Sequence, residues 1–153
     1  MNKLQFENVT EFKKMIGQEL PVSNWICVTQ QMINDFANAT LDKQWVHVDG
    51  ARAKRESPFK TTIAHGFMSV ALVSKFLEDL IQINSIKLGL NYGLNSVRFA
   101  NPVMVNSNIR LKSIVKNIED HKNGTKVTFS CFVEIEGEEK PACIAEFLTL
   151  LFE

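Results

Sequence analysis

The sequence has no excess of charge of either sign. Seventeen lysine and arginine residues balance seventeen aspartate and glutamate residues among 153, so no net field attracts nucleic acid or an anionic membrane. Cysteine is scarce too: Cys27, Cys131 and Cys143 lie far apart, without a C-x-x-C pair or a zinc-like spacing. We therefore expect no nucleic-acid partner, and we interpret the cysteines as small buried side chains in a reducing compartment.

Linkers and membrane-spanning segments are missing as well. The chain has 7 glycines and 4 prolines and no Pro/Gly/Ser-rich stretch or internal repeat, so residues 1–153 are expected to form a single domain. Residues 1–19 lack the apolar core of a signal peptide. The most apolar helix candidate, residues 66–83, is interrupted by three charged side chains and does not read as a membrane span. These absences predict a cytoplasmic protein that does not interact with membranes.

Short elements are expected in the first third of the chain. Apolar residues before Gly17 fit one or two amphipathic helical turns. Residues 25–28 read as a strand, and Thr29 as the N-cap of a helix that continues to Ala39. Residues 40–62 show no clear periodicity, and we interpret them as a long irregular loop of the kind that often carries function.

The remaining pattern predicts one long helix followed by strands. Residues 64–83 would span about 30 Å as a helix, and apolar side chains on nearly every face require that it be enclosed by protein. Alternating apolar residues predict antiparallel strands over 103–115 and 127–135, and residues 142–152 read as a central strand. The fold class is therefore α+β, with an antiparallel sheet wrapped around a central helix. Because one curved sheet covers only one side of that helix, we expect a homodimer.

Two of the three histidines lie where they can do chemistry. His47 falls in the long loop near Asp42 and Asp49, and His65 opens the apolar helix. An imidazole near a carboxylate is the minimum for general acid–base catalysis at neutral pH. One alternative is a solvated aspartate beside a packing histidine. Another is a metal site, which lacks the support of an H-E-x-x-H helix or a cysteine cluster.

The start of the apolar helix is a second candidate site. The free N–H groups and the positive end of the helix dipole favour negative charge on a ligand, and Gly66 would allow a close approach to that backbone. The alternative is that Gly66 only permits tight packing. Nucleotide binding and serine-hydrolase chemistry have no support, because the sequence contains no G-x-G-x-x-G, P-loop or G-x-S-x-G motif.

Several motifs, in order along the chain, carry a family resemblance. They are Phe36-Ala-Asn-Ala-Thr-Leu-Asp42-Lys-Gln-Trp-Val-His47-Val-Asp49, Ser57-Pro-Phe and Thr62-Ile-Ala-His65-Gly66-Phe. They resemble the MaoC-type dehydratases, the (R)-specific enoyl-CoA hydratases of the hot-dog fold. The run from Gln44 to Asp49, together with Asn91-Tyr-Gly-Leu-Asn95-Ser-Val-Arg98-Phe99, resembles the branch named after nodulation protein N.

The resemblance implies a hydro-lyase that reversibly adds water to trans-2-enoyl thioesters, giving (R)-3-hydroxyacyl-CoA without a metal or an organic cofactor. Its substrate would be carried by coenzyme A or acyl carrier protein. Asp42 and His47 would match the catalytic pair that orients and deprotonates the water. The Gly66 N–H would match the donor to the thioester oxygen. Positions that relatives use to bind substrate are matched by Gln44, Ser74 and Leu77.

One position departs from the family pattern. Relatives usually carry glycine before the catalytic aspartate, where this chain has Leu41. If that position requires a positive φ, Leu41 is strained or the loop is rebuilt. Leu41 keeps one alternative function open, a non-catalytic subunit that binds acyl thioesters. A second alternative is a hot-dog thioesterase, since such enzymes also direct helix-start N–H groups at a thioester carbonyl.

Overall fold

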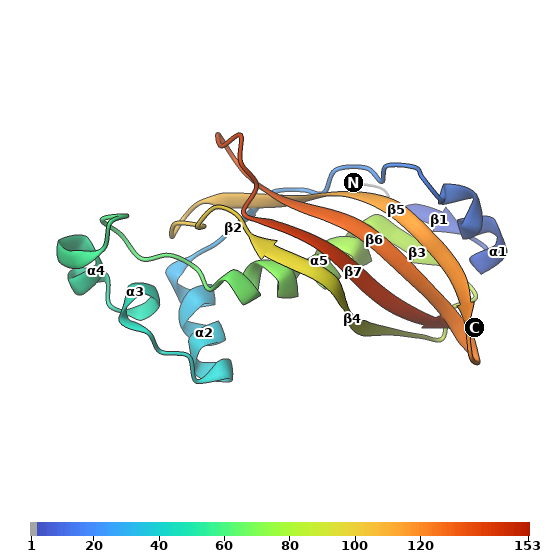
Figure 1. Ribbon diagram of the computed structural model, residues 1–153, viewed down its shortest axis with the longest axis horizontal. Helices are drawn as coiled ribbons and strands as arrows, with labels where there is room; N and C mark the ends of the chain where they lie inside the picture. Colours follow the sequence, from blue (N-terminus) through green and yellow to red (C-terminus); the bar gives the residue numbers. More distant parts are fainter. Residues whose placement is uncertain (1–2) are drawn as a thin grey trace.

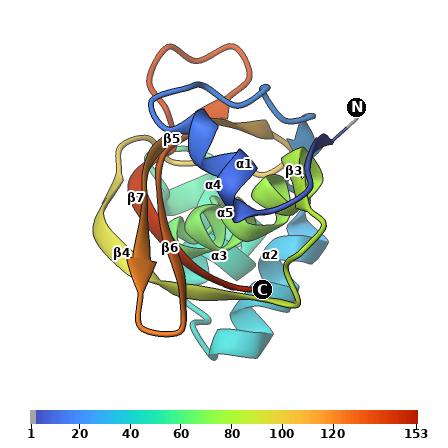
Figure 2. The ribbon, with the colours of Figure 1, turned by 90° about the vertical axis from the view of Figure 1, so that its right-hand side faces the viewer.

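Five antiparallel strands curl around one long helix in the computed structural model, which describes residues 3–153 (Figures 1 and 2). In chain order the elements are β1 (Leu4–Phe6), α1 (Val9–Phe12), a 3-10 turn (Lys13–Met15), β2 (Ile26–Cys27), α2 (Gln30–Thr40), α3 (Trp45–Val48), α4 (Gly50–Glu56), α5 (Gly66–Leu80), β3 (Ile81–Ile83), β4 (Leu88–Phe99), β5 (Asn108–His121), β6 (Gly124–Ile135) and β7 (Cys143–Phe152). The helices α2, α3 and α4 lie together at one end of the molecule, beyond the sheet (Figure 1).

The sheet has the strand order β2-β5-β6-β7-β4, and every neighbouring pair is antiparallel. The hairpin expected near residues 123–124 joins β5 to β6, where His121 pairs with Gly124. Buried side chains that alternate with partly buried ones along most of β5 and β6 give the sheet one apolar face, which covers α5. The predicted α+β architecture is confirmed.

The core lies between α5 and the sheet. Val73, Phe76 and Leu80 on the helix are almost fully buried. They pack in one cluster with inward-facing residues of the sheet, among them Ile109, Leu111, Val115, Val127 and Val133. Each of these large side chains contributes about 1.5–3 kcal/mol on burial, so this layer holds the helix, and the site at its start, in place.

One side of α5 is not covered within a single chain. Phe67 is 65% exposed, and exposed positions continue at helical spacing through Ala71, Lys75 and Glu78. All twelve residues of β4, at the edge of the sheet, are exposed as well. The sheet therefore encloses only one side of α5, as the sequence predicts for a single chain, and the enclosure of this stripe by a second copy stays a prediction.

Several predicted boundaries are corrected. The loop expected over residues 40–62 contains α3 and α4, and the Asp49 carboxylate caps α4 by accepting from the Arg52 N–H at 2.9 Å. The long helix begins at Gly66 and ends at Leu80 instead of spanning 64–83. The next residues, 81–83, are extended because they pair in parallel with β1.

The strand β4 was not predicted, and β5 begins later than expected. Register shifts along β4, between residues 91 and 93 and between 94 and 96, break the alternation that reveals a strand. At the opposite edge, the short strand β2 and the α2 helix capped by Thr29 follow their predictions.

The cysteines are free, and two of the three are buried as predicted. Burial raises the pKa of Cys131 to about 12 and that of Cys143 to about 11, so both behave as inert core side chains. Cys27 is exposed, which corrects the expectation for that residue. Among residues 3–153, no helix combines the length and the apolarity needed to cross a membrane.

Candidate active site

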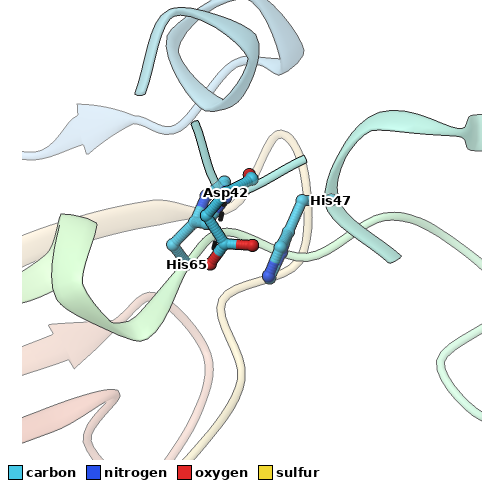
Figure 3. A group of neighbouring side chains, drawn as sticks. All are labelled: Asp42, His47 and His65. Carbon is cyan, nitrogen blue, oxygen red and sulfur yellow. Dashed lines mark hydrogen bonds and ion pairs between the residues drawn. The ribbon is translucent and has the colours of Figure 1, made fainter. Parts of the chain in front are cut away.

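Three polar side chains from separate segments meet at the end of the molecule that carries α2 to α4 (Figure 3). Asp42 follows the end of α2, His47 lies on α3, and His65 is the residue before α5. One ligand-type atom from each side chain lies within 4.8 Å of the others. The two residues predicted as a catalytic pair are thus brought together, with His65 as a third member.

The turn before Asp42 has a positive φ, as the resemblance to a family with glycine at this position predicts. Leu41 is the C-cap of α2 with φ 63° and ψ 9°, and its side chain is 79% exposed. A left-handed conformation at a non-glycine residue costs roughly 1–2 kcal/mol. The loop is therefore not rebuilt around Leu41, and the chain carries this strain directly beside the site.

His47 is oriented by a backbone carbonyl. Its Nδ1 lies 2.7 Å from the Ile63 carbonyl oxygen, and since a carbonyl only accepts, Nδ1 carries the proton of the neutral ring. The Nε2 lone pair is then free to accept a proton. Figure 3 shows the Asp42 carboxylate turned toward this ring, so a base and a carboxylate face a common space.

Burial sets the electrostatics of His47, which is only 8% exposed. Desolvation lowers its pKa below the ordinary value of 6.5, and the neighbouring His65 acts in the same direction. The Ile63 carbonyl and the Asp42 carboxylate raise the pKa and offset part of this shift. The result is an imidazole that is neutral at pH 7, as a proton acceptor must be.

His65 is almost completely buried, at 4% exposure. Its ring stacks on His47 with 3.8 Å between centroids and 26° between planes. Its Nε2 lies 2.9 Å from the backbone oxygen of Asp42 and 4.0 Å from that residue's Oδ2. Sequence reasoning noticed His65 as a possible ligand but gave it no catalytic role, because only the folded chain stacks it on His47.

Gly66 begins α5, so its N–H has no acceptor within the helix. A Cβ at this position would lie 2.7 Å from the Phe99 ring, closer than real contacts allow. The packing interpretation of Gly66 is therefore correct. It is compatible with a binding role, since the N–H at the first position of α5 has no partner within the helix.

Gln44 is exposed at the N-cap position of α3. Its backbone oxygen accepts from the His47 N–H at 3.0 Å, and its own N–H lies 3.4 Å from the Asp42 carboxylate. It is therefore adjacent to the pair. A role for its side-chain amide stays a prediction.

The other two predicted substrate residues line a separate hollow. Ser74 and Leu77 lie along α5, and Ser74 is about 12 Å from Gly66 at 1.5 Å per residue. Both line a pocket of about 750 Å³ between α5, β3 and β4, and Ser74 Oγ donates to Asn91 on β4 at 3.1 Å. The structure thus places them at a distance from the pair, on the helix that His65 precedes.

The same three side chains, Asp42, His47 and His65, are of the type that binds metals. Two of their four imidazole nitrogens face backbone carbonyls at 2.7 and 2.9 Å and so carry protons in the neutral rings. One unprotonated nitrogen is left on each ring, and such a nitrogen can accept a proton or bind a metal.

Comparison with known proteins identifies the family. The sequence model of the MaoC-like domain matches residues 11–134. The chain is 46% identical over 142 residues to 3-hydroxyacyl-thioester dehydratase Z of Mycobacterium tuberculosis, covering 92% of this chain and 93% of that protein. It is 37% identical over 145 residues to nodulation protein N of Rhizobium meliloti, covering 94% and 90%.

The fold has solved counterparts. R-hydratase PhaJ1 of Pseudomonas aeruginosa superimposes with a TM-score of 0.77 at 23% identity, covering 97% of this chain and 87% of that one. Its likeness supports the hot-dog fold, while the relatives above support a hydro-lyase, the class that includes dehydratases and hydratases. The chain is therefore an enzyme of that class. By sequence and by fold, it belongs to the MaoC-like dehydratase family.

Proposed function

We propose that this enzyme adds water reversibly to the double bond of a trans-2-enoyl thioester and forms an (R)-3-hydroxyacyl thioester. The observation that carries the proposal is the buried His47 ring, held by the Ile63 carbonyl so that Nε2 is free, beside the carboxylate of Asp42. Proton transfer to and from water requires this combination. The reaction uses no metal and no organic cofactor.

In the proposed mechanism Asp42 and His47 bind one water and remove a proton from it. The water oxygen forms a bond to the β-carbon, and the π electrons move through the α-carbon onto the thioester oxygen. The Gly66 N–H donates to that oxygen where the negative charge develops, and the Gln44 amide helps to hold the water or the thioester. The proton then passes from the pair to the α-carbon, so that the sum of the steps is the addition of H and OH.

The acyl chain occupies the pocket lined by Ser74 and Leu77. This pocket measures about 750 Å³, and many of its other walls are apolar, among them Ile81, Phe129 and Leu151. Such a volume falls within the range of pockets for drug-sized ligands. We therefore propose substrates with acyl chains long enough to extend along α5, carried by coenzyme A or acyl carrier protein.

A homodimer completes the proposal. The edge strand β4 is exposed along its whole length and carries six large apolar side chains, Leu88, Leu90, Tyr92, Leu94, Val97 and Phe99. A long apolar edge of this kind promotes pairing with another chain unless it is covered. A second copy would cover β4 together with the exposed side of α5 and so bury these apolar side chains. Sedimentation should then give twice the 17.4 kDa chain mass. We also place the enzyme in the cytoplasm, where the exposed Cys27 thiol stays reduced.

The test is turnover of trans-2-butenoyl-CoA and longer homologues, followed by the loss of the conjugated absorbance and by chiral analysis of the product. Asp42→Asn should keep the fold and lose about 10²–10⁴-fold in kcat, the range for a general acid–base group. Asp49→Asn is the matched control, because Asp49 caps α4 and asparagine caps equally well. Equal activity in both variants, or release of free CoA from saturated acyl-CoA, contradicts the proposal.

A further inference from the structure

The stacked ring of His65 has no role in the two-residue mechanism above. It is buried between neighbours that leave it little freedom: the His47 ring at 3.8 Å between centroids and the Phe36 ring at 5.0 Å. Its Nδ1 meets no donor or acceptor among the described residues. A buried histidine in such a position calls for a physical reason.

The hydrogen bonds define the proton on each ring. His65 Nε2 faces the Asp42 backbone oxygen at 2.9 Å, so Nε2 carries the proton and Nδ1 is bare. His47 faces the Ile63 carbonyl through Nδ1 and therefore carries its proton there. The two stacked imidazoles are thus neutral rings with opposite tautomers.

This arrangement keeps a transferred proton on one ring. A second proton on His65 would have no protein acceptor, since Nδ1 is buried without a partner among residues 3–153. It would also place two positive rings 3.8 Å apart. When His47 takes a proton from water, the stacked His65 ring limits the tilt of the reacting imidazole.

The same ring holds the strained turn. Leu41 is left-handed, and the Asp42 N–H has only a long contact of 3.4 Å to Thr40 Oγ1. The 2.9 Å bond from His65 to the Asp42 carbonyl is the shorter of the two backbone contacts of Asp42. This hydrogen bond from His65 therefore fixes the backbone of Asp42, whose carboxylate must face the water.

We propose that His65 is a positioning residue of the catalytic pair, which fixes the Asp42 backbone through its Nε2–H and the plane of His47 through stacking. The proposal rests on the hydration function for its kinetic consequences. Its structural part, the opposite tautomers and the bond to Asp42, is independent of any substrate.

The first measurement is the long-range ¹H–¹⁵N spectrum of the histidine side chains of the wild-type protein at pH 7.5. It should show a protonated Nδ1 on His47 and a protonated Nε2 on His65. The same tautomer on both rings, or a doubly protonated His65, overturns the proposal. This result stands even if no enoyl thioester turns over, so its failure and that of the proposed function are distinguishable.

Two variants then separate the hydrogen bond from the ring. His65→Phe keeps an aromatic ring against His47 but removes the donor to Asp42, whereas His65→Gln keeps an N–H donor and removes the ring. Loss of positioning by about 1 Å costs on the order of 10²-fold, so His65→Phe should lower kcat by about 10²-fold with little change in KM. His65→Gln should recover at least about tenfold of that loss, as a restored donor predicts. Wild-type kcat in His65→Phe, or an effect on KM alone, refutes the proposal.

Discussion

Replacement of Leu41 by glycine tests whether the left-handed turn beside the site is strained. Leu41 adopts φ 63°, a conformation that costs a residue with a Cβ roughly 1–2 kcal/mol. Glycine avoids this cost but adds about 0.4–1 kcal/mol of chain entropy to the unfolded state. Compared with alanine, which has the same strain and removes the same exposed side chain, glycine should be more stable by about 0.8 kcal/mol, the difference of these two terms.

The assay is thermal unfolding of Leu41→Gly and Leu41→Ala at one protein concentration, since association shifts the midpoint. For a domain of this size 1 kcal/mol corresponds to about 2–4 °C, so the glycine variant should melt about 2–3 °C above the alanine variant. Ala39→Gly, two residues earlier and still inside α2, is the control and should lower the midpoint, because glycine costs about 1 kcal/mol within a helix. If Leu41→Gly melts below Leu41→Ala, the turn is not strained and the reasoning fails.

Three further predictions concern the site and the pocket. Folding lowers the pKa of His47 below 6.5, so the unfolded chain binds a proton at this residue at a higher pH than the folded chain does. His47 therefore contributes stability above pH 6.5, and that contribution is lost as the pH falls through the folded pKa. The acid limb of kcat/KM should also lie below pH 6.5, and a limb above it contradicts the assignment of the base. Gly66→Ala should lower the free energy of unfolding in urea by about 1–3 kcal/mol through overpacking, because the added methyl carbon would lie 2.7 Å from the Phe99 ring. Combining Gly66→Ala with Phe99→Leu should recover part of the lost stability, and an unchanged stability in Gly66→Ala argues against the contact. Ser74→Leu fills part of the pocket and should lower kcat/KM for long enoyl-CoA by about 10-fold or more, while the four-carbon substrate is unaffected. The magnitude follows from about 1–3 kcal/mol per methylene-sized change in a pocket. Equal losses for both chain lengths would place the acyl chain elsewhere.

Most of the fold was accessible from periodicity. The apolar run of α5 and the alternation in β5 and β6 follow directly from which side chains face the core. The helices α3 and α4 were missed because their 4 and 7 residues are too short for a periodic signal. The strand β4 was missed because two register shifts interrupt its alternation and because neither of its faces is buried in a single chain.

The sequence by itself determined the chemistry that is available: a carboxylate and an imidazole five residues apart, a glycine at a helix start, and a leucine directly before the carboxylate. Local spacing and residue type carry that information. Only the tertiary structure decided how these groups act. The stacking of His47 on His65 and the carbonyl partners of both rings join residues from three segments. Such contacts depend on how α2, α3 and α5 pack together, and no local pattern encodes that packing.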